Sequence, residues 1–427
     1  MYKNLFLTLF KWIFFGAIIG LIIGSTTAFL LYTNDFLGET REGNSWLILC
    51  LPLAGLVLGY IYMNLGTSAG TELYKGNNLV IEAVHGKAKI LRRLGPIVYL
   101  GTFMTVLFGG STGREGAAIQ MGGSVAEAVN RFFKVNVIDT KILLMSGISA
   151  GFGAAFGTPI TGAIFGMEMV TLGKMKYKAL VPCLVSSFVG HYTAEKVWGT
   201  QHETFIIQSV PELSLMSFAK VILLAILFSL VSVLYSQLRH GIHKVSEKYT
   251  KKNHALRAFI GGMIIVALTF IVGSYDYNGR GLDMLEESFK QDVPPYAFLA
   301  KLVFTAVTLG TGFVGGEAIP LFFMGATLGN TLYHFIDFPM SFLAGLGMIA
   351  TFCGGANTPI AAFLLGVELF DGQGIEFLFV ACLTSYLFSG HHGLWPSQMI
   401  YVPKSRLYKI ANGKTIKDVE QKKRNGC

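Results

Sequence analysis

Apolar segments recur along the whole chain, and several of them are separated by glycine-rich breaks instead of charged loops. A helix needs about 20 apolar residues to cross the hydrocarbon core of a bilayer. The first segment, Leu5 to Tyr32, is long enough, and we interpret it as a retained first helix because it shows no small-residue cleavage site. The later apolar segments are Trp46 to Leu65, Pro96 to Gly110, Ile142 to Phe156, Pro159 to Leu172, Ala179 to Tyr192, Leu213 to Leu238, Ala255 to Tyr275, Tyr296 to Leu309, Pro320 to Phe335, Ser341 to Phe352, Pro359 to Phe370 and Ile375 to Phe388. Many of them are shorter than a full span.

The glycine-rich breaks are the first pointer to a function. Irregular backbone at membrane depth is tolerated only where it is buried in protein or lines a water-filled cavity. Short apolar segments interrupted by glycine therefore predict an ion or substrate site of the kind found in transporters.

Composition agrees with a membrane protein and excludes a soluble one. Of the 427 residues, 52% are hydrophobic and only 14% are charged, whereas ordinary soluble chains carry about 25% charged residues. The net charge of +9 is concentrated in two stretches, Arg239 to Arg257 and Lys404 to Arg424. Basic residues beside spans favour the cytoplasmic side, so we expect both stretches and both termini there. Binding of the second stretch to anionic lipid or nucleic acid is the alternative, and we expect no nucleic-acid partner.

Motifs for metal or enzyme chemistry are missing from the sequence. The five cysteines form no CxxC pair, and no HExxH, GxSxG or Walker-type spacing occurs. The pair His391-His392 has no ligand partners at a suitable spacing. We therefore predict no metal, no cofactor and no enzymatic activity.

The apolar region contains an internal repeat. Thr-Pro-Ile at 158–160, followed by Gly166 and Glu168, returns at 358–360 with Gly366 and Glu368. This predicts two halves, at about 8–195 and 213–400, within a membrane domain 1–400, and a short basic tail 401–427. Duplicated halves with broken helices are transporter architecture. The upstream positions Thr102, Thr105, Gly109, Gly113, Met121 and Gly122 match Thr305, Thr308, Gly312, Gly316, Met324 and Gly325.

The most informative break, residues 109–123, leads into a helix that we expect to begin near Glu115. The exposed N–H groups and the positive end of the dipole at such a terminus bind anions. Glu115 can occupy that site itself, and a permeating anion can compete for it, so one carboxylate would serve as gate and proton carrier. The alternative is a glutamate that only caps its helix. An ionisable residue within the membrane is functional by default.

Two further breaks contain polar residues. Glu317 stands just before Pro320, at the place in the second half that matches Glu115, and its alternatives are a direct role, a helix cap or an ion pair with Lys301. In the break at residues 75–80, Asn77 and Asn78 each offer amide donors beside Gly76.

Together these motifs resemble the CLC family of chloride channels and anion/proton antiporters, over roughly residues 8 to 400. Gly113 to Gly116 is similar to the family's gating-glutamate motif, with Ala117 where the family usually has proline. The segments 156–168 and 357–368 resemble its paired helix ends. The resemblance implies an all-α polytopic membrane protein with two inverted halves of short, broken and tilted helices. It also implies a homodimer with one anion path per subunit, and Glu115 as the external gate that binds and releases protons.

Departures from the chloride-type pattern resemble the fluoride-exporting branch of that family. Asn77 replaces a serine, Glu317 lies next to the path, and Met169 stands where many antiporters have an internal proton-handling glutamate. Ile319 differs from the threonine expected in that branch. Trp395 falls where a central tyrosine is usual. By this resemblance the anion-binding residues are Gly76, Asn77, Asn78, Gly113, Arg114, Gly116, Ala318, Ile319 and Trp395, with Glu317 as a candidate for coupling.

The sequence thus predicts a multi-pass fluoride/proton antiporter of the cell membrane that exports fluoride. An asparagine amide offers two N–H donors where serine offers one hydroxyl, which suits a small, strongly hydrated anion. The expected partners are fluoride or chloride, protons, membrane lipid and a second copy of the chain. A chloride channel or chloride/proton exchanger of the same family is the alternative.

Overall fold

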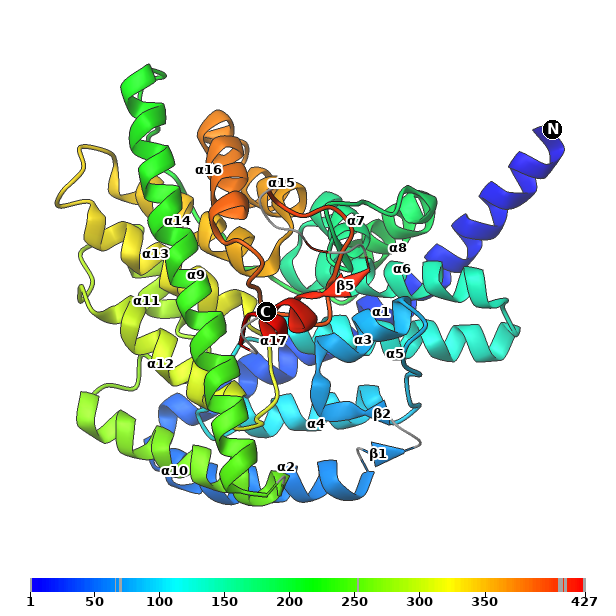
Figure 1. Cartoon of the computed structure of the whole chain (residues 1–427), viewed down its shortest axis with the longest axis horizontal. Helices are drawn as coiled ribbons and strands as arrows, with labels where there is room; N and C mark the ends of the chain where they lie inside the picture. The colour runs from blue at the N-terminus through cyan, green and yellow to red at the C-terminus, as the bar shows by residue number, and fades with distance from the viewer. Residues whose placement is uncertain are drawn as a thin grey trace.

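The computed structural model describes residues 2–65, 67–68, 71–251, 253–405, 410 and 413–424. The described chain is built almost entirely of helices, with a few two-residue strands (Figure 1). The helices are α1 (Tyr2–Gly43), α2 (Leu51–Leu65), α3 (Asn77–Val84), α4 (Leu94–Leu107), α5 (Glu115–Phe133), α6 (Val137–Phe156), α7 (Pro159–Glu168), α8 (Leu180–Tyr192), α9 (Leu215–Tyr249), α10 (His254–Val272), α11 (Leu282–Glu287), α12 (Ala297–Gly310), α13 (Ala318–Leu332), α14 (Met340–Ala356), α15 (Pro359–Leu369), α16 (Ile375–Phe388) and α17 (Ile416–Arg424). Short turns of other helix types cover Ser45–Cys50, Leu73–Lys75, Tyr177–Ala179 and Thr193–Val197, and the strands are β1 (Thr67–Ser68), β2 (Thr71–Glu72), β3 (Thr171–Leu172), β4 (Met399–Ile400) and β5 (Lys414–Thr415).

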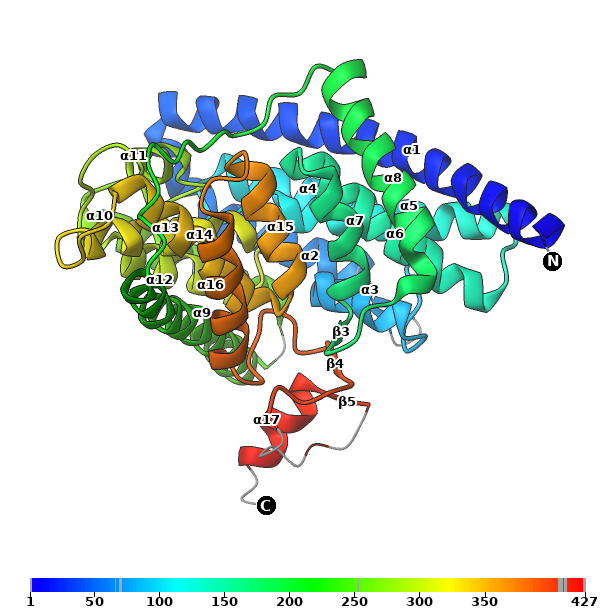
Figure 2. The same cartoon turned by 90° about the horizontal axis from the view of Figure 1, so that it is seen from above.

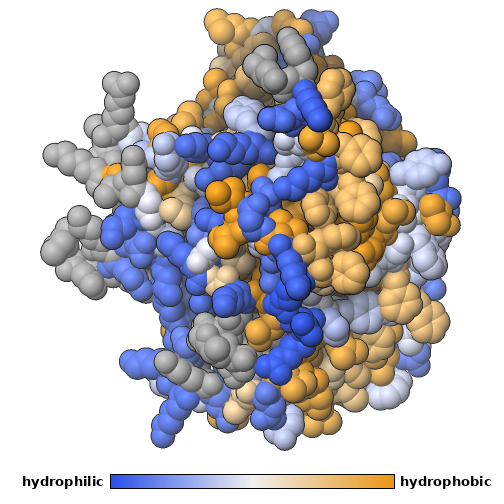
Figure 3. Space-filling view, turned by 90° about the vertical axis from the view of Figure 1, so that its right-hand side faces the viewer, coloured by the Kyte–Doolittle hydropathy of each residue, from blue (hydrophilic) through white to orange (hydrophobic). Residues whose placement is uncertain are grey.

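Long and short apolar helices coexist, as the sequence predicts for this fold. Five described helical segments have the length and composition to cross a membrane: Lys3–Gly43, Ser45–Leu65, Val137–Phe156, Leu215–Tyr249 and His254–Val272. Shorter apolar helices, including α4, α12, α13 and α15, lie among them. On the face shown in Figure 3, apolar side chains gather in a broad belt with hydrophilic residues beside it. Such a belt is the surface that lipid tails require.

The two halves repeat the same packing. Helix α1 packs against α4, α5, α6 and α8, and α9 packs in the same way against α12, α13, α14 and α16. Within each half the chain also breaks in the same manner. Helix α6 ends at Gly157 (φ +74°) and α14 at Asn357 (φ +58°), both in the left-handed region. Pro159 and Pro359 then begin the next helices, where a missing N–H is no loss.

Reciprocal hydrogen bonds join the halves. The Glu168 carboxylate at the end of α7 accepts the backbone N–H groups of Ile360 (3.3 Å) and Ala361 (2.8 Å) at the start of α15. Glu368 at the end of α15 accepts those of Ile160 (2.9 Å) and Thr161 (2.7 Å) at the start of α7. Each carboxylate therefore caps the opposite helix, where the dipole favours negative charge. This exchange is the contact expected of two halves related by a two-fold axis.

The described part of the C-terminal tail projects from one side of the helical body (Figure 2). Strand β3, which follows α7, pairs with β4, and β4 pairs with β5 of the tail. Leu172, Ile400 and Ile416 form a small apolar cluster beneath this sheet. Residue Cys427 of the predicted tail lies outside the described residues.

Candidate functional site

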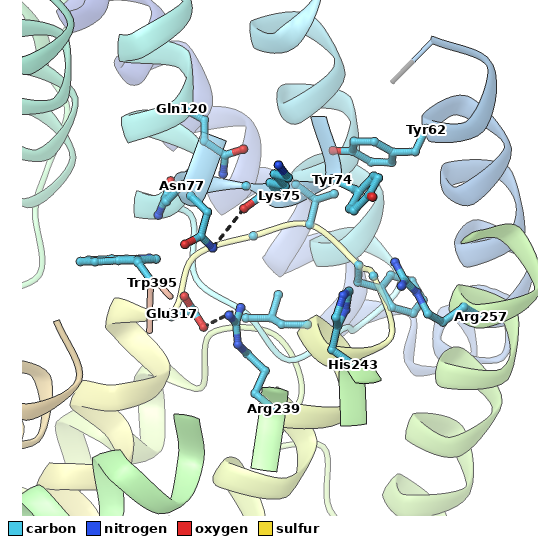
Figure 4. A pocket seen from close by; sticks show the side chains of 17 residues that line it. Tyr62, Tyr74, Lys75, Asn77, Gln120, Arg239, His243, Arg257, Glu317 and Trp395 are labelled. Carbon is cyan, nitrogen blue, oxygen red and sulfur yellow. Dashed lines mark hydrogen bonds and ion pairs between the residues drawn. The ribbon is translucent and has the colours of Figure 1, made fainter. Parts of the chain in front are cut away.

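The central feature is a cavity of about 80 Å³ where the breaks in the two halves meet (Figure 4). Gly76, at φ +60°, precedes α3 and turns the chain so that the first residues of that helix line the cavity. Backbone from the second half closes the opposite wall. The lining residues are Tyr62, Tyr74, Lys75, Gly76, Asn77, Asn78, Gln120, Arg239, His243, Arg257, Leu309, Gly312, Phe313, Val314, Gly315, Glu317 and Trp395.

The two asparagines of the first break have different environments. The Asn78 amide donates to the Lys75 carbonyl (3.3 Å), and its oxygen accepts the Ser397 N–H (3.0 Å). Asn78 therefore fixes the loop. The Asn77 side chain is buried, and its Oδ1 has no hydrogen-bond partner in the structure. An unpaired amide oxygen needs a donor and does not itself bind an anion; Asn77 is nevertheless the one of the pair whose side chain is not committed to the loop, so its NH₂ can serve a ligand.

Glu317 faces the same cavity and belongs to a polar cluster on its wall. Its Oε1 lies 3.0 Å from Arg239 Nη1 and accepts the Tyr235 hydroxyl at 3.1 Å. Trp395 lines the cavity nearby, with its indole nitrogen unpaired (Figure 4). The predicted alternative of a pair with Lys301 is wrong. Lys301 donates instead to the Tyr277 and Gly279 carbonyls, at 3.2 and 2.9 Å, which already satisfy its buried ammonium.

The N-termini of α5 and α13 meet beside this cavity. Gly113 and Gly316 exchange two backbone hydrogen bonds, of 2.9 and 2.7 Å. A Cβ on Gly116 would lie 2.9 Å from Gly316 Cα and 3.4 Å from Asn77 Nδ2. No side chain fits at Gly116, because the two segments approach each other at backbone distance. This close approach explains the glycines at the junction. Ile319 is buried in the first turn of α13, close to Gly113.

Glu115 is the first residue of α5, as predicted, and its carboxylate lies against this glycine junction. The residue is 3% exposed, and its Oε2 has no hydrogen-bond partner. A Cβ on Gly316 would lie 2.9 Å from that oxygen, and a side chain at Gly113 would collide with it. The carboxylate therefore occupies the narrow space between the two helix N-termini, which is the position where an anion is favoured.

Next to Glu115 lies a cluster of two guanidinium groups and two carboxylates. Arg114 contacts Asp35 (2.5 Å) and Glu203 (3.0 Å), and Arg280 contacts the same carboxylates at 2.7 and 3.1 Å. Asp35 and Arg280 also line a second cavity, of about 350 Å³. Glu115 thus adjoins both the glycine junction beside the central cavity and the charged cluster that contains Arg114. The Arg114 guanidinium is paired with two carboxylates, so its role is structural. Arg114 does not line the central cavity.

The structure brings Gly76, Asn77, Asn78, Glu317 and Trp395 together on one cavity. Gly113, Glu115, Gly116 and Ile319 lie at the adjoining junction, and Ala318 is buried in the first turn of α13. Met169, at the end of α7, is fully buried.

Sequence reasoning missed the contributions of α5 and α9 to the cavity. Gln120 lies one turn after Gly116 and donates to its carbonyl (3.1 Å), and a polar residue on the cavity face of a glycine-rich helix was a usable signal. Arg239, Tyr235 and His243 come from α9. The sequence predicts Arg239 and Arg257 only as basic residues that flank a membrane span. Arg257 is in fact 2% exposed, on α10.

The chain is similar to proteins of one membrane family. The family described as "Voltage gated chloride channel" matches residues 54–390. A "Chloride/fluoride channel protein" of Pseudomonas syringae pv. tomato is 38% identical over 397 residues, which cover 91% of this chain and 86% of the relative. An H(+)/Cl(-) exchange transporter, ClcA of Vibrio parahaemolyticus, is 24% identical over 413 residues, covering 89% of this chain and 86% of the relative.

Solved structures agree with this similarity. The crystal structure of a CLC-type fluoride/proton antiporter superimposes with a TM-score of 0.87 at 30% identity, covering 92% of this chain and 98% of the other. A slow cyanobacterial Cl-/H+ antiporter shares the fold with a TM-score of 0.75 at 21% identity, covering 89% and 94% of the two chains.

Proposed function

Since the chain belongs to the voltage-gated chloride channel family, the CLC family, we propose that this membrane anion transporter exchanges fluoride for protons and exports fluoride. The predicted fold of inverted halves with short, broken helices is confirmed. The observation that carries the proposal is the Glu115 carboxylate, which is buried at the junction of two helix N-termini with one oxygen unpaired. It stands between the central cavity and the charged cluster of Arg114.

This position supports a role as gate and proton carrier. When ionised, the carboxylate fills the space between the N-termini of α5 and α13, and its charge repels an approaching anion. When protonated, it loses its attraction to the positive helix ends and can move aside for the anion. One residue then alternates between proton and anion, which is the coupling an antiporter requires.

The lining of the cavity supports fluoride. Asn77 can offer its amide NH₂, Trp395 has an unpaired indole N–H, and the adjacent helix N-termini offer backbone N–H groups. A small anion must exchange a tightly held hydration shell for such donors. The similarity to a protein named as a chloride/fluoride channel and to a fluoride/proton antiporter points in the same direction.

Glu317 is a candidate for coupling on the cavity side. It is buried beside the Arg239 guanidinium and the Tyr235 hydroxyl, so its charge is balanced in the resting state. Glu168, which adjoins Met169, is committed to capping α15. Glu317 is therefore the carboxylate that a proton leaving Glu115 toward the cavity can reach on that wall, and taking up the proton would weaken its ion pair with Arg239.

The remaining parts of the proposal concern assembly and placement. The protein works as a homodimer in a cell membrane, with both termini in the cytoplasm and with one anion path per subunit. The basic residues of the tail support this orientation.

The test is reconstitution into liposomes loaded with fluoride or chloride, with anion efflux and proton influx recorded together. Fluoride efflux that drives proton movement is the expected result. A preference for chloride would favour the exchanger alternative, and anion flux without proton movement would favour a channel.

Two variants assign the roles within the same assay. Glu115→Gln cannot carry a proton, so proton movement should stop, while anion leak survives in a channel. Asn77→Ala should lower fluoride flux more than chloride flux, because it removes donors from the cavity. Asn78→Ala is the comparison for loss of the loop's hydrogen bonds, and it should lower both fluxes alike. If Glu115→Gln changes neither flux, Glu115 is not the gate.

A further inference from the structure

The C-terminal tail is attached to the segment that carries Trp395. Beyond the pairing of β4 with β5, the Ile416 N–H donates to the Gln398 carbonyl (3.1 Å) and the Lys417 N–H to the Pro396 carbonyl (2.9 Å). Ile416 is fully buried. The same segment is held on its other side by the first break, through Ser397 and Asn78. The wall of the central cavity is therefore fixed in part by the tail.

The tail also borders a wider space outside the central cavity, which we name the tail-side vestibule. This cavity of about 220 Å³ is lined by Lys417 and Glu420 of α17 together with Glu82, His240, Lys244 and Pro396. Asn78, Arg239, His243 and Leu309 line both the vestibule and the central cavity. An ion that reaches the central cavity from this side passes α17.

The charges of the vestibule are not balanced. Glu82 is paired with Lys75 (3.1 Å), and Glu420 lies 3.7 Å from His392 Nδ1. Arg239 is paired with Glu317. Lys244 and Lys417 have no carboxylate partner among the residues that the structure describes. Unpaired cations around a confined opening raise the local concentration of anions.

The geometry points to α17 as a built wall of the anion path, and to Lys417 as a residue that attracts the transported anion into the vestibule. This rests on the proposed anion transport, and it assigns the tail a part in it. Two features hold α17 in place. Thr415 and Asp418 exchange hydrogen bonds at its start, of 2.8 and 3.2 Å, and Ile416 packs against Leu172 and Ile400.

The experiment measures initial fluoride efflux from liposomes at ionic strengths from ~10 mM to ~300 mM, set with an impermeant salt. Lys417→Glu changes the charge beside the path by two units, so efflux should fall about two- to fourfold at the lowest ionic strength. The difference should shrink toward zero at the highest, because salt screens the interaction. Lys414→Glu is the matched control. It makes the same charge change three residues earlier, at an exposed position of β5 that does not line the vestibule.

A second background separates position from net charge. Ile416→Asp places a charge in the apolar cluster and releases α17, so Lys417→Glu should have no further effect in that variant. Size-exclusion chromatography in detergent verifies that each variant is folded. Equal efflux for Lys417→Glu and Lys414→Glu, or an undiminished effect of Lys417→Glu in the Ile416→Asp background, would overturn the inference. Absence of fluoride and chloride efflux in the unmodified protein would instead overturn the proposed function.

Discussion

The ion pair of Arg239 and Glu317 on the wall of the central cavity allows a quantitative test of the site. Its two atoms lie 3.0 Å apart, and the side chains are 18% and 8% exposed. We consider Arg239→Met, which keeps much of the length and apolar stem of arginine but removes the charge. The change leaves Glu317 buried without a cationic partner, and the Tyr235 hydroxyl still donates to it.

The expected cost has two parts. Breaking a buried ion pair from one side costs about 3–5 kcal/mol, since the remaining charge is uncompensated. Arg239 also donates to the Leu394 carbonyl at 3.0 Å, and loss of that bond adds about 1 kcal/mol. In the double variant Arg239→Met with Glu317→Gln the buried charge is gone and the amide oxygen still accepts from Tyr235. The double variant should therefore regain all but about 1–2 kcal/mol of the free energy of unfolding.

The assay is chemical denaturation in detergent, with the free energy of unfolding taken by linear extrapolation for the unmodified protein, both single variants and the double variant. A coupling energy of several kcal/mol in this cycle means that Glu317 is ionised and paired when no anion is bound. Two outcomes would contradict this reasoning: Arg239→Met as stable as the unmodified protein, or a double variant no more stable than Arg239→Met. Either would mean that Glu317 does not carry a buried charge.

Two further predictions concern the junction of the halves. Glu168→Gln and Glu368→Gln each place an amide NH₂ against backbone donors at a helix N-terminus. Each variant should lower the free energy of unfolding, followed by thermal denaturation, by about 1–3 kcal/mol. A loss in only one of them would contradict the equivalence of the two caps. Gly116→Ala puts a Cβ 2.9 Å from Gly316 Cα and should cost about 1–3 kcal/mol together with a loss of fluoride efflux. The control is Gly241→Ala, whose Cβ meets open space on α9, and it should be neutral or stabilising by up to about 1 kcal/mol. Equal fluoride efflux in Gly116→Ala and Gly241→Ala would refute close packing at the junction.

Much of the fold could be predicted from the sequence because composition, glycine breaks and Thr-Pro pairs act on their own neighbours. A low fraction of charged residues requires lipid contact, wherever each helix lies. Glycine runs and Thr-Pro pairs restrict the backbone of their own neighbours, so the start of α5 at Glu115 and of the helices at Pro159 and Pro359 was predictable. The repeat of these signals was sufficient to predict two halves. The glycine breaks themselves predicted Glu115 as gate and proton carrier and Asn77 as a donor, and the resemblance to a known family added fluoride as the expected anion.

The tertiary structure decided which groups meet. Nothing near Glu317 in the sequence indicates Arg239 as its partner, because any cation brought within reach would satisfy a buried carboxylate, and Lys301 was an equal alternative. Asn77 and Asn78 are neighbours of the same type, and only the folded loop shows that Asn78 bonds to Lys75 and Ser397 while the Asn77 oxygen stays unpaired. The sequence of the tail likewise indicates only its basic composition. Its place beside the cavity depends on the pairing of β5 with β4. The sequence alone determined a membrane fold with a few ionisable residues in its breaks. The packing of two inverted halves, which joins segments far apart along the chain, determined their partners and the cavity they surround.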